Sequence, residues 1–181
     1  MFNPKAAYFY FLAVKILLTR FIKKIYFLTH YYNKSLKTKL PEHLYFYPNP
    51  FLLSCFVNQK IFAFKLSKVN VDAFWNNFES IKESEDLNSF FWLNLINRKN
   101  DGEAIQQIIS IWIRNNKKYK KKNWGSLQIS KRILAWILNL DIILNNADGV
   151  FKEIFFNSII IQVNHLKNNL NDENDPARKI E

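Results

Sequence analysis

The chain has 181 residues, with 26 Lys and Arg against 15 Asp and Glu, a formal net charge of +11 and a hydrophobic content of 49%. This length is typical of one domain or of two small ones, and the apolar content excludes a disordered chain. A single cysteine, Cys55, excludes an intrachain disulfide and a cysteine zinc site, and the lack of glycine-rich phosphate-binding motifs argues against nucleotide chemistry.

Residues 1–40 are predicted to form a basic, aromatic-rich N-terminal helix. The apolar run 6–14 resembles the core of a signal peptide, but Lys15 follows it and a small-residue cleavage site does not. A transmembrane span needs about 20 apolar residues, and basic side chains such as Arg20 interrupt this stretch. We therefore expect residues 5–34 to lie as an amphipathic helix on the protein or on a membrane surface, with an uncleaved membrane anchor as the alternative.

Residues 41–85 are predicted to be a connector between the N-terminal helix and a helical body. Three prolines near its start exclude one continuous helix, and residues 44–66 are expected to be irregular. Two apolar runs, 51–57 and 61–66, are close enough to pair as a short hairpin. Trp75 is expected to pack against the body.

Helical patterns dominate residues 86–181. Ile105, Ile108, Ile109 and Trp112 follow the spacing of one apolar helix face. Because short loops separate successive helices, we expect an all-α fold of stacked antiparallel helical hairpins. The pattern predicts helices over residues 87–98, from Asp101 to the lysine run 117–122, from Ser126 to about Asn145, and from Val150 to Leu170.

The basic charge has two centres, the N-terminal arm and the lysine run 117–122. Such blocks attract polyanions, whether nucleic acid, anionic lipid or acidic polysaccharide, by a long-range field, and a role in solubility is the alternative. We expect no nucleic-acid partner, because the aromatic residues among the basic ones fall on helix faces and not in an RNA-binding motif.

An ordered series of motifs resembles the N-terminal part of the heparinase II/III family of polysaccharide lyases, especially its bacterial branch. In that family a W-L-x-x-L segment, a helix ending in W-I, a lone Trp and an S-x-R-x-x-x-W helix follow one another, and a helix with S and Q comes next. The matching segments here are 90–97 (FFWLNLIN), 104–115 (AIQQIISIWIRN), Trp124, 130–136 (SKRILAW), and Ser158, Gln162, His165 and Leu166.

The resemblance implies an incomplete α/α toroid, expected to be followed by a β-sandwich, in an enzyme that cleaves the glycosidic bond beside a uronic acid by β-elimination. It implies an acidic, uronate-containing polysaccharide as partner and a location in the periplasm or cell envelope; a cytoplasmic location is the alternative, because no cleavable signal is evident. A whole toroid needs several hundred residues, so we expect a fragment or a degenerate relative that is inactive alone. A noncatalytic helical binding module at a membrane surface is the alternative function.

Three residues are candidates for substrate binding: Trp124, Arg132 and Trp136. Arg132 and Trp136 are four positions apart on one helix, so they are expected to stack, either to present a cation and a ring to a glycan or to lock helix packing. Trp124 is expected to flank the same groove or to fill a gap between helices. His165 is expected to be structural. We assign no catalytic residue, no metal site and no cofactor.

Overall fold

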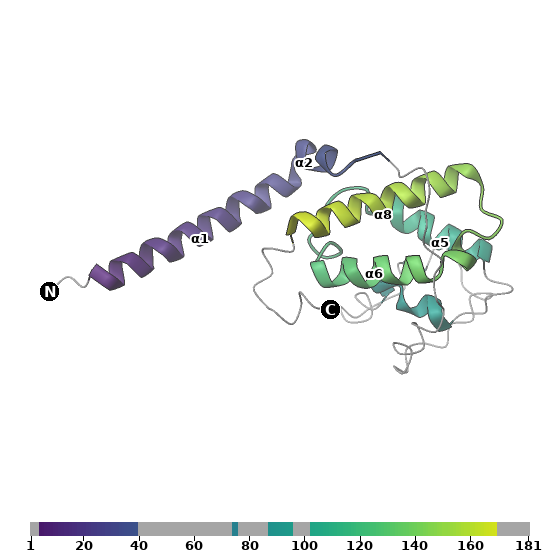
Figure 1. Cartoon of the computed structure of the whole chain (residues 1–181), viewed down its shortest axis with the longest axis horizontal. Coiled ribbons are helices and arrows are strands. Elements are labelled where there is room, and N and C mark those ends of the chain that lie inside the picture. The colour runs from purple at the N-terminus through teal and green to yellow at the C-terminus, as the bar shows by residue number, and fades with distance from the viewer. Residues whose placement is uncertain (1–3, 40–73, 76–86, 96–101, 170–181) are drawn as a thin grey trace. The chain divides into compact units, whose positions relative to one another are not determined.

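Helices make up all the regular structure that can be described in this chain (Figure 1). This confirms the all-α fold class. The chain divides into two compact units, Met1–Leu36 and Lys37–Glu181. The hairpin predicted over 51–66 lies outside the described residues, as does Cys55. The computed structural model describes residues 4–39, 74–75, 87–95 and 102–169.

The first unit consists of a long helix and a short one. Helix α1 spans Pro4–Leu28, which corresponds to about 38 Å at 1.5 Å per residue, and α2 spans His30–Ser35. The side chain of Thr29 caps α2 by accepting a hydrogen bond from the backbone N–H of Tyr32 at 3.2 Å. The buried ring of Tyr32 contacts the ring of Phe27, with centroids 4.7 Å apart, and so fixes the turn between the helices.

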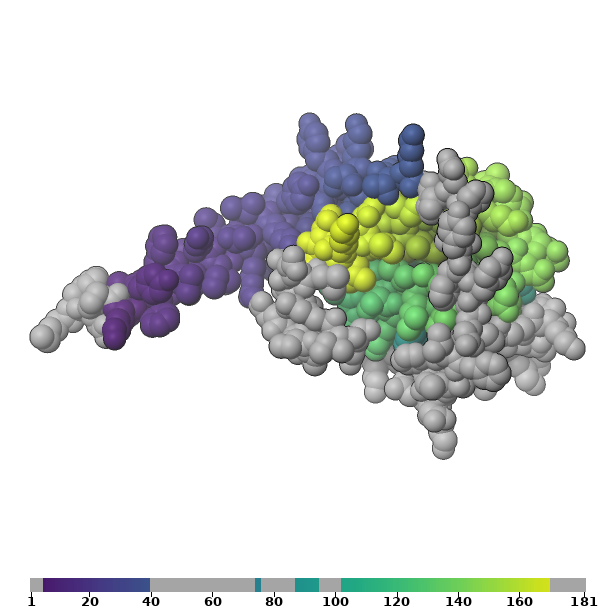
Figure 2. Space-filling model, in the orientation of Figure 1, coloured from purple at the N-terminus to yellow at the C-terminus, as the bar shows by residue number. Residues whose placement is uncertain are grey.

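Apolar side chains of α1 are exposed along its length. Phe11 and Phe21, for example, are 69% and 62% exposed, and Figure 2 shows the side chains standing out from this helix. Among the residues described, no helix is both long and apolar enough to cross a membrane.

The longest helices in the described part of the second unit are α5 (Gly102–Asn115), α6 (Ser126–Leu138) and α8 (Gly149–Asn169). Helix α8 packs against both α5 and α6, and it runs in the opposite direction to α6 (Figure 1). A short 3-10 helix, η2 (Phe91–Leu95), packs against α6, and α7 (Leu140–Ile143) packs against α5 and α6. The predicted antiparallel pairing is therefore present for α6 and α8.

The helix predicted from Ser126 to Asn145 is interrupted at Asn139. Its side-chain Nδ2 donates to the backbone oxygen of Ala135 and to Oδ1 of Asn94, both at 2.8 Å. A side chain that bonds nearby backbone competes with the helical ladder, and the residue leaves helical geometry at φ −111°. The sequence contains no Pro or Gly here to signal the break.

The helix predicted over residues 87–98 is also broken, because Phe90 has a φ of 59°. Left-handed backbone is unfavourable for a bulky residue and persists where the surroundings enforce it. Here Phe90 is fully buried, and its ring lies 5.6 Å from Trp92, 5.8 Å from Trp112 and 5.2 Å from Trp136 between centroids. Packing of this ring therefore holds the turn between residues 87–89 and η2.

The core of the second unit lies between the helices and is unusually aromatic. The predicted stripe of α5 is buried, as expected, and the indole Nε1 of Trp75 donates to the backbone oxygen of Ile108 at 3.2 Å. Trp75 therefore packs against the body as the sequence predicted. The buried aromatic residues of this core are Phe74, Phe90, Trp92, Trp112, Trp136, Phe151 and Phe155.

Replacing Phe90 by Ala should lower the free energy of unfolding by about 3–5 kcal/mol, because the ring is fully buried and no neighbour can fill its place without moving. The matched control is Phe91→Ala, which removes a half-buried ring next to it and should cost about 1 kcal/mol. Chemical denaturation followed by circular dichroism measures both. Equal losses in the two variants would contradict the role given to Phe90.

Candidate functional site

The guanidinium of Arg132 lies at the centre of the second unit and is completely buried. It comes from the middle of α6 and donates to three separate segments. Its Nε donates to Oε1 of Gln162 on α8, and its terminal nitrogens donate to the backbone oxygens of Asn88 and Asn123, each at 3.0 Å. One side chain thus ties α6 to the loop before it, to the segment before η2, and to α8.

Residues from different sequence motifs meet around this guanidinium. Its carbon lies 4.1 Å from the centre of the Trp112 ring, and Nε1 of Trp112 donates to Oδ1 of Asn88 at 2.7 Å. Gln162 in turn donates from Nε2 to the backbone oxygen and the hydroxyl of Ser158, each at 3.2 Å. The network therefore joins the W-I, S-x-R and S…Q segments of the chain.

The acceptors around Arg132 are carbonyl and amide oxygens. Removing the guanidinium from water disfavours its charged form, and burial lowers the pKa of Arg132 to about 9. Because this value lies above neutral pH, the side chain stays protonated and keeps donating to its three acceptors. The hydrogen bonds and the Trp112 ring offset part of the desolvation cost.

Trp136, which was predicted to stack on Arg132 and to meet a sugar ring, lies in the aromatic core. It is fully buried, and its ring contacts those of Trp112 and Phe155, with centroids 5.5 and 5.2 Å apart. The ring under the guanidinium is that of Trp112, from a different helix. Both members of the predicted pair thus occupy packing positions, the alternative that the sequence left open.

Trp124 lies in a second, smaller aromatic group with Tyr119 and His165. Its ring is 5.1 Å from that of His165 and 6.2 Å from that of Tyr119 between centroids, and both Trp124 and His165 are buried. Partial burial raises the pKa of the Tyr119 hydroxyl. His165 holds the loop after α5 against α8, so its contacts are those of a packing residue.

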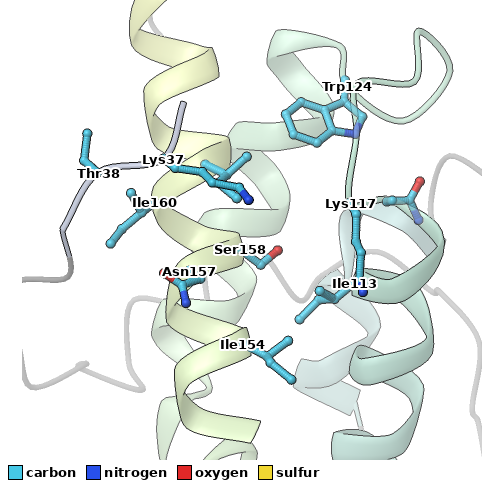
Figure 3. Close-up of a pocket in the computed structure, with 11 residues that line it drawn as sticks. Lys37, Thr38, Ile113, Lys117, Trp124, Ile154, Asn157, Ser158 and Ile160 are labelled. Carbon is cyan, nitrogen blue, oxygen red and sulfur yellow. The ribbon is translucent and has the colours of Figure 1, made fainter. Parts of the chain in front are cut away.

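A cavity of about 380 Å³ opens beside Trp124, between α8 and the C-terminal end of α5 (Figure 3). Its walls combine ammonium groups, amides and hydroxyls with isoleucine side chains, so it suits a small molecule that carries negative charge. Within the described ranges, no cluster of His, Cys, Asp or Glu could hold a metal ion. The lining residues with polar or aromatic side chains include Lys37, Asn116, Lys117, Trp124, Asn157 and Ser158.

The sequence predicted no cavity, although some of the lining residues had drawn attention for other reasons. Trp124 was a candidate for substrate binding, Lys117 belongs to the lysine run, and Ser158 belongs to the family resemblance. Asn157 carried no signal, because it stands alone on a helix whose polar positions follow no clear stripe. Arg132 and Trp136 lie in the core and are not among the lining residues.

Comparisons of the chain with family models, with curated proteins and with solved structures find no match. The lyase resemblance therefore stays a prediction that rests on the motifs themselves.

Replacing Arg132 by Met should lower the free energy of unfolding by about 3–5 kcal/mol, since three buried oxygens lose their donor. Lys131→Met, which removes a half-buried charge one position earlier, should cost less than about 1 kcal/mol. Urea denaturation provides the measurement.

The difference between wild type and Arg132→Met should be constant between about pH 5 and pH 8, because both folded and unfolded arginine are protonated there. Above the lowered pKa of about 9 the folded state binds fewer protons than the unfolded state, so the arginine contribution to stability should become more favourable. A difference that changes steeply near pH 7 would contradict this assignment.

Proposed function

We propose that the second unit is the opening part of an α/α toroid in a lyase that acts on uronate-containing polysaccharides. The observation that carries the proposal is the network around Arg132. Motif residues that are far apart in the sequence, Trp112, Arg132 and Gln162, meet there through short polar contacts. Sequence motifs are expected to mark residues that hold a fold together. Because these motif residues contact one another, their series supports the family resemblance as a whole.

The reaction in such lyases is a β-elimination beside a uronate. A base removes the proton at C5, the electron pair forms the C4–C5 double bond, the bond from C4 to the glycosidic oxygen breaks, and an acid protonates that oxygen. The uronate carboxylate must be neutralised so that the C5 proton becomes acidic enough. We assign neither the base nor the acid to a residue of this chain. The role proposed for the chain is to form part of the helical framework and to contact the glycan.

The cavity beside Trp124 is the proposed contact site for the acidic glycan. The ammonium of Lys117 provides a cation for a carboxylate, and Asn157 and Ser158 provide amide and hydroxyl groups for sugar hydroxyls. Ile113 and Ile154 add apolar surface to the walls, which suits the faces of a sugar ring. Lys117 thus replaces Arg132 as the candidate for carboxylate binding, since Arg132 is buried and fully engaged.

Titration of the chain with short oligouronates tests this site. Lys117→Gln should weaken binding by about threefold to fivefold, as expected for one exposed ion pair. The matched control is Lys118→Gln, which removes the same charge from an exposed neighbour that does not line the cavity, and it should change binding by less than about twofold.

Two results would contradict the proposal. One is equal binding of oligouronates and of neutral oligosaccharides of the same length. The other is an equal loss in Lys117→Gln and Lys118→Gln, which would show that the lysine run acts only through its general field.

The chain alone is also expected to release no unsaturated, ultraviolet-absorbing product from uronate polymers.

A further inference from the structure

One face of α1 carries apolar side chains at alternating intervals of four and three residues. At about 100° per residue, these positions form one continuous stripe along the helix. All but the small Ala7 are large side chains that are more than half exposed, so the stripe is open to solvent in the described structure. Its residues are Ala7, Phe11, Val14, Leu18, Phe21, Ile25 and Leu28.

The charges of α1 are confined to the rest of its circumference. Every cation lies about 90° or more around the helix axis from the centre of the stripe. The described segment 4–39 contains no Asp or Glu, so its field is positive throughout. The basic residues of α1 are Lys5, Lys15, Arg20, Lys23 and Lys24.

Cations at the border of the stripe decide which partner fits it. Lys15 and Lys24 flank the stripe on opposite sides, at positions where paired helices carry complementary charges. A second copy of α1 would offer these lysines no acidic residue to pair with. A bilayer with anionic lipids instead offers an apolar interior to the stripe and negative headgroups to the flanking lysines.

We propose that α1 binds the surface of an anionic membrane, lying parallel to it with the Phe11, Leu18 and Ile25 side of the stripe inserted below the headgroups. In this orientation Lys15 and Arg20, near the middle of the helix, stay at headgroup depth. A helix that spanned the bilayer would instead place both side chains within the hydrocarbon. Lys23 lies on the side of the helix opposite the stripe, with its Nζ over the ring of Phe27 at 5.5 Å from the centroid.

Aromatic residues near the N-terminal end suit the same location. Tyr8 and Tyr10 are both more than 60% exposed and lie on the two sides of the stripe. Tyr is favoured at the boundary between lipid and water, because its ring is apolar and its hydroxyl is polar. The inference concerns the first unit and stands independently of the function proposed for the second.

Cosedimentation of the full chain with vesicles tests the proposal. Vesicles of phosphatidylcholine with phosphatidylserine should bind the chain at low salt, whereas pure phosphatidylcholine vesicles or high salt should weaken binding by at least about tenfold. Leu18→Gln should weaken binding to the anionic vesicles by about tenfold, since it removes an inserted side chain without changing the charge.

The matched control is Ile16→Gln, two residues earlier on the opposite face of the same helix. It removes an exposed apolar side chain of the same size and should change binding by less than about twofold. Circular dichroism verifies that both variants keep their helix content, and oriented circular dichroism of the bound chain should report α1 parallel to the bilayer.

Four outcomes would overturn the inference. Binding that is independent of lipid charge and salt would contradict the attraction between the lysines and the headgroups. Equal effects of Leu18→Gln and Ile16→Gln would contradict insertion of one face of α1. A stable dimer that Leu18→Gln dissociates, or a helix oriented across the bilayer, would assign the stripe to a different partner or orientation.

Discussion

The arrangement of the helices in the second unit depends on one buried cation, the guanidinium of Arg132. Arg132 reaches from α6 to backbone oxygens in two other segments and to Gln162 on α8, so its side chain specifies how these segments are spaced. Burying a charge is unfavourable unless each donor finds an acceptor, which penalises any arrangement that separates α6 from α8. The Trp112 ring beneath the guanidinium extends the same constraint to α5.

Aromatic side chains are buried in the second unit and exposed along α1 in the first. In the second unit large rings fill the interior, and even Phe90 adopts an unfavourable backbone conformation so that its ring can remain there. In the first unit Phe11 and Phe21 are exposed along a helix that is also strongly basic. A single average over the chain hides this contrast, because an aromatic content of 17% fits either arrangement. The first unit leaves large apolar side chains exposed on a long helix, and the second unit buries them in its own core.

Local patterns predicted the elements better than their contacts. The isoleucine stripe of α5 follows from spacing alone, because periodicity reports which side of a helix is apolar. The range predicted for the last helix, 150–170, also agrees with α8 at Gly149–Asn169. The hydrogen bond from Asn139 to Asn94 and the stacking of Arg132 on Trp112 both depend on how separate segments lie against each other. Neither can be read from neighbours within one helix. Trp124, a candidate for substrate binding from the sequence, lines the cavity, whereas nothing in the sequence indicated Asn157, for the same reason.

The five tryptophans of the chain all belong to the second unit, and four of them are buried there. The first unit contains Tyr and Phe but no Trp within its length. Intrinsic tryptophan emission therefore reports the solvation of the second unit. It carries no direct signal from the unfolding of α1, which contains no Trp. A transition followed by fluorescence and one followed by helix content need not coincide in this protein, and their separation would measure how independently the two units fold.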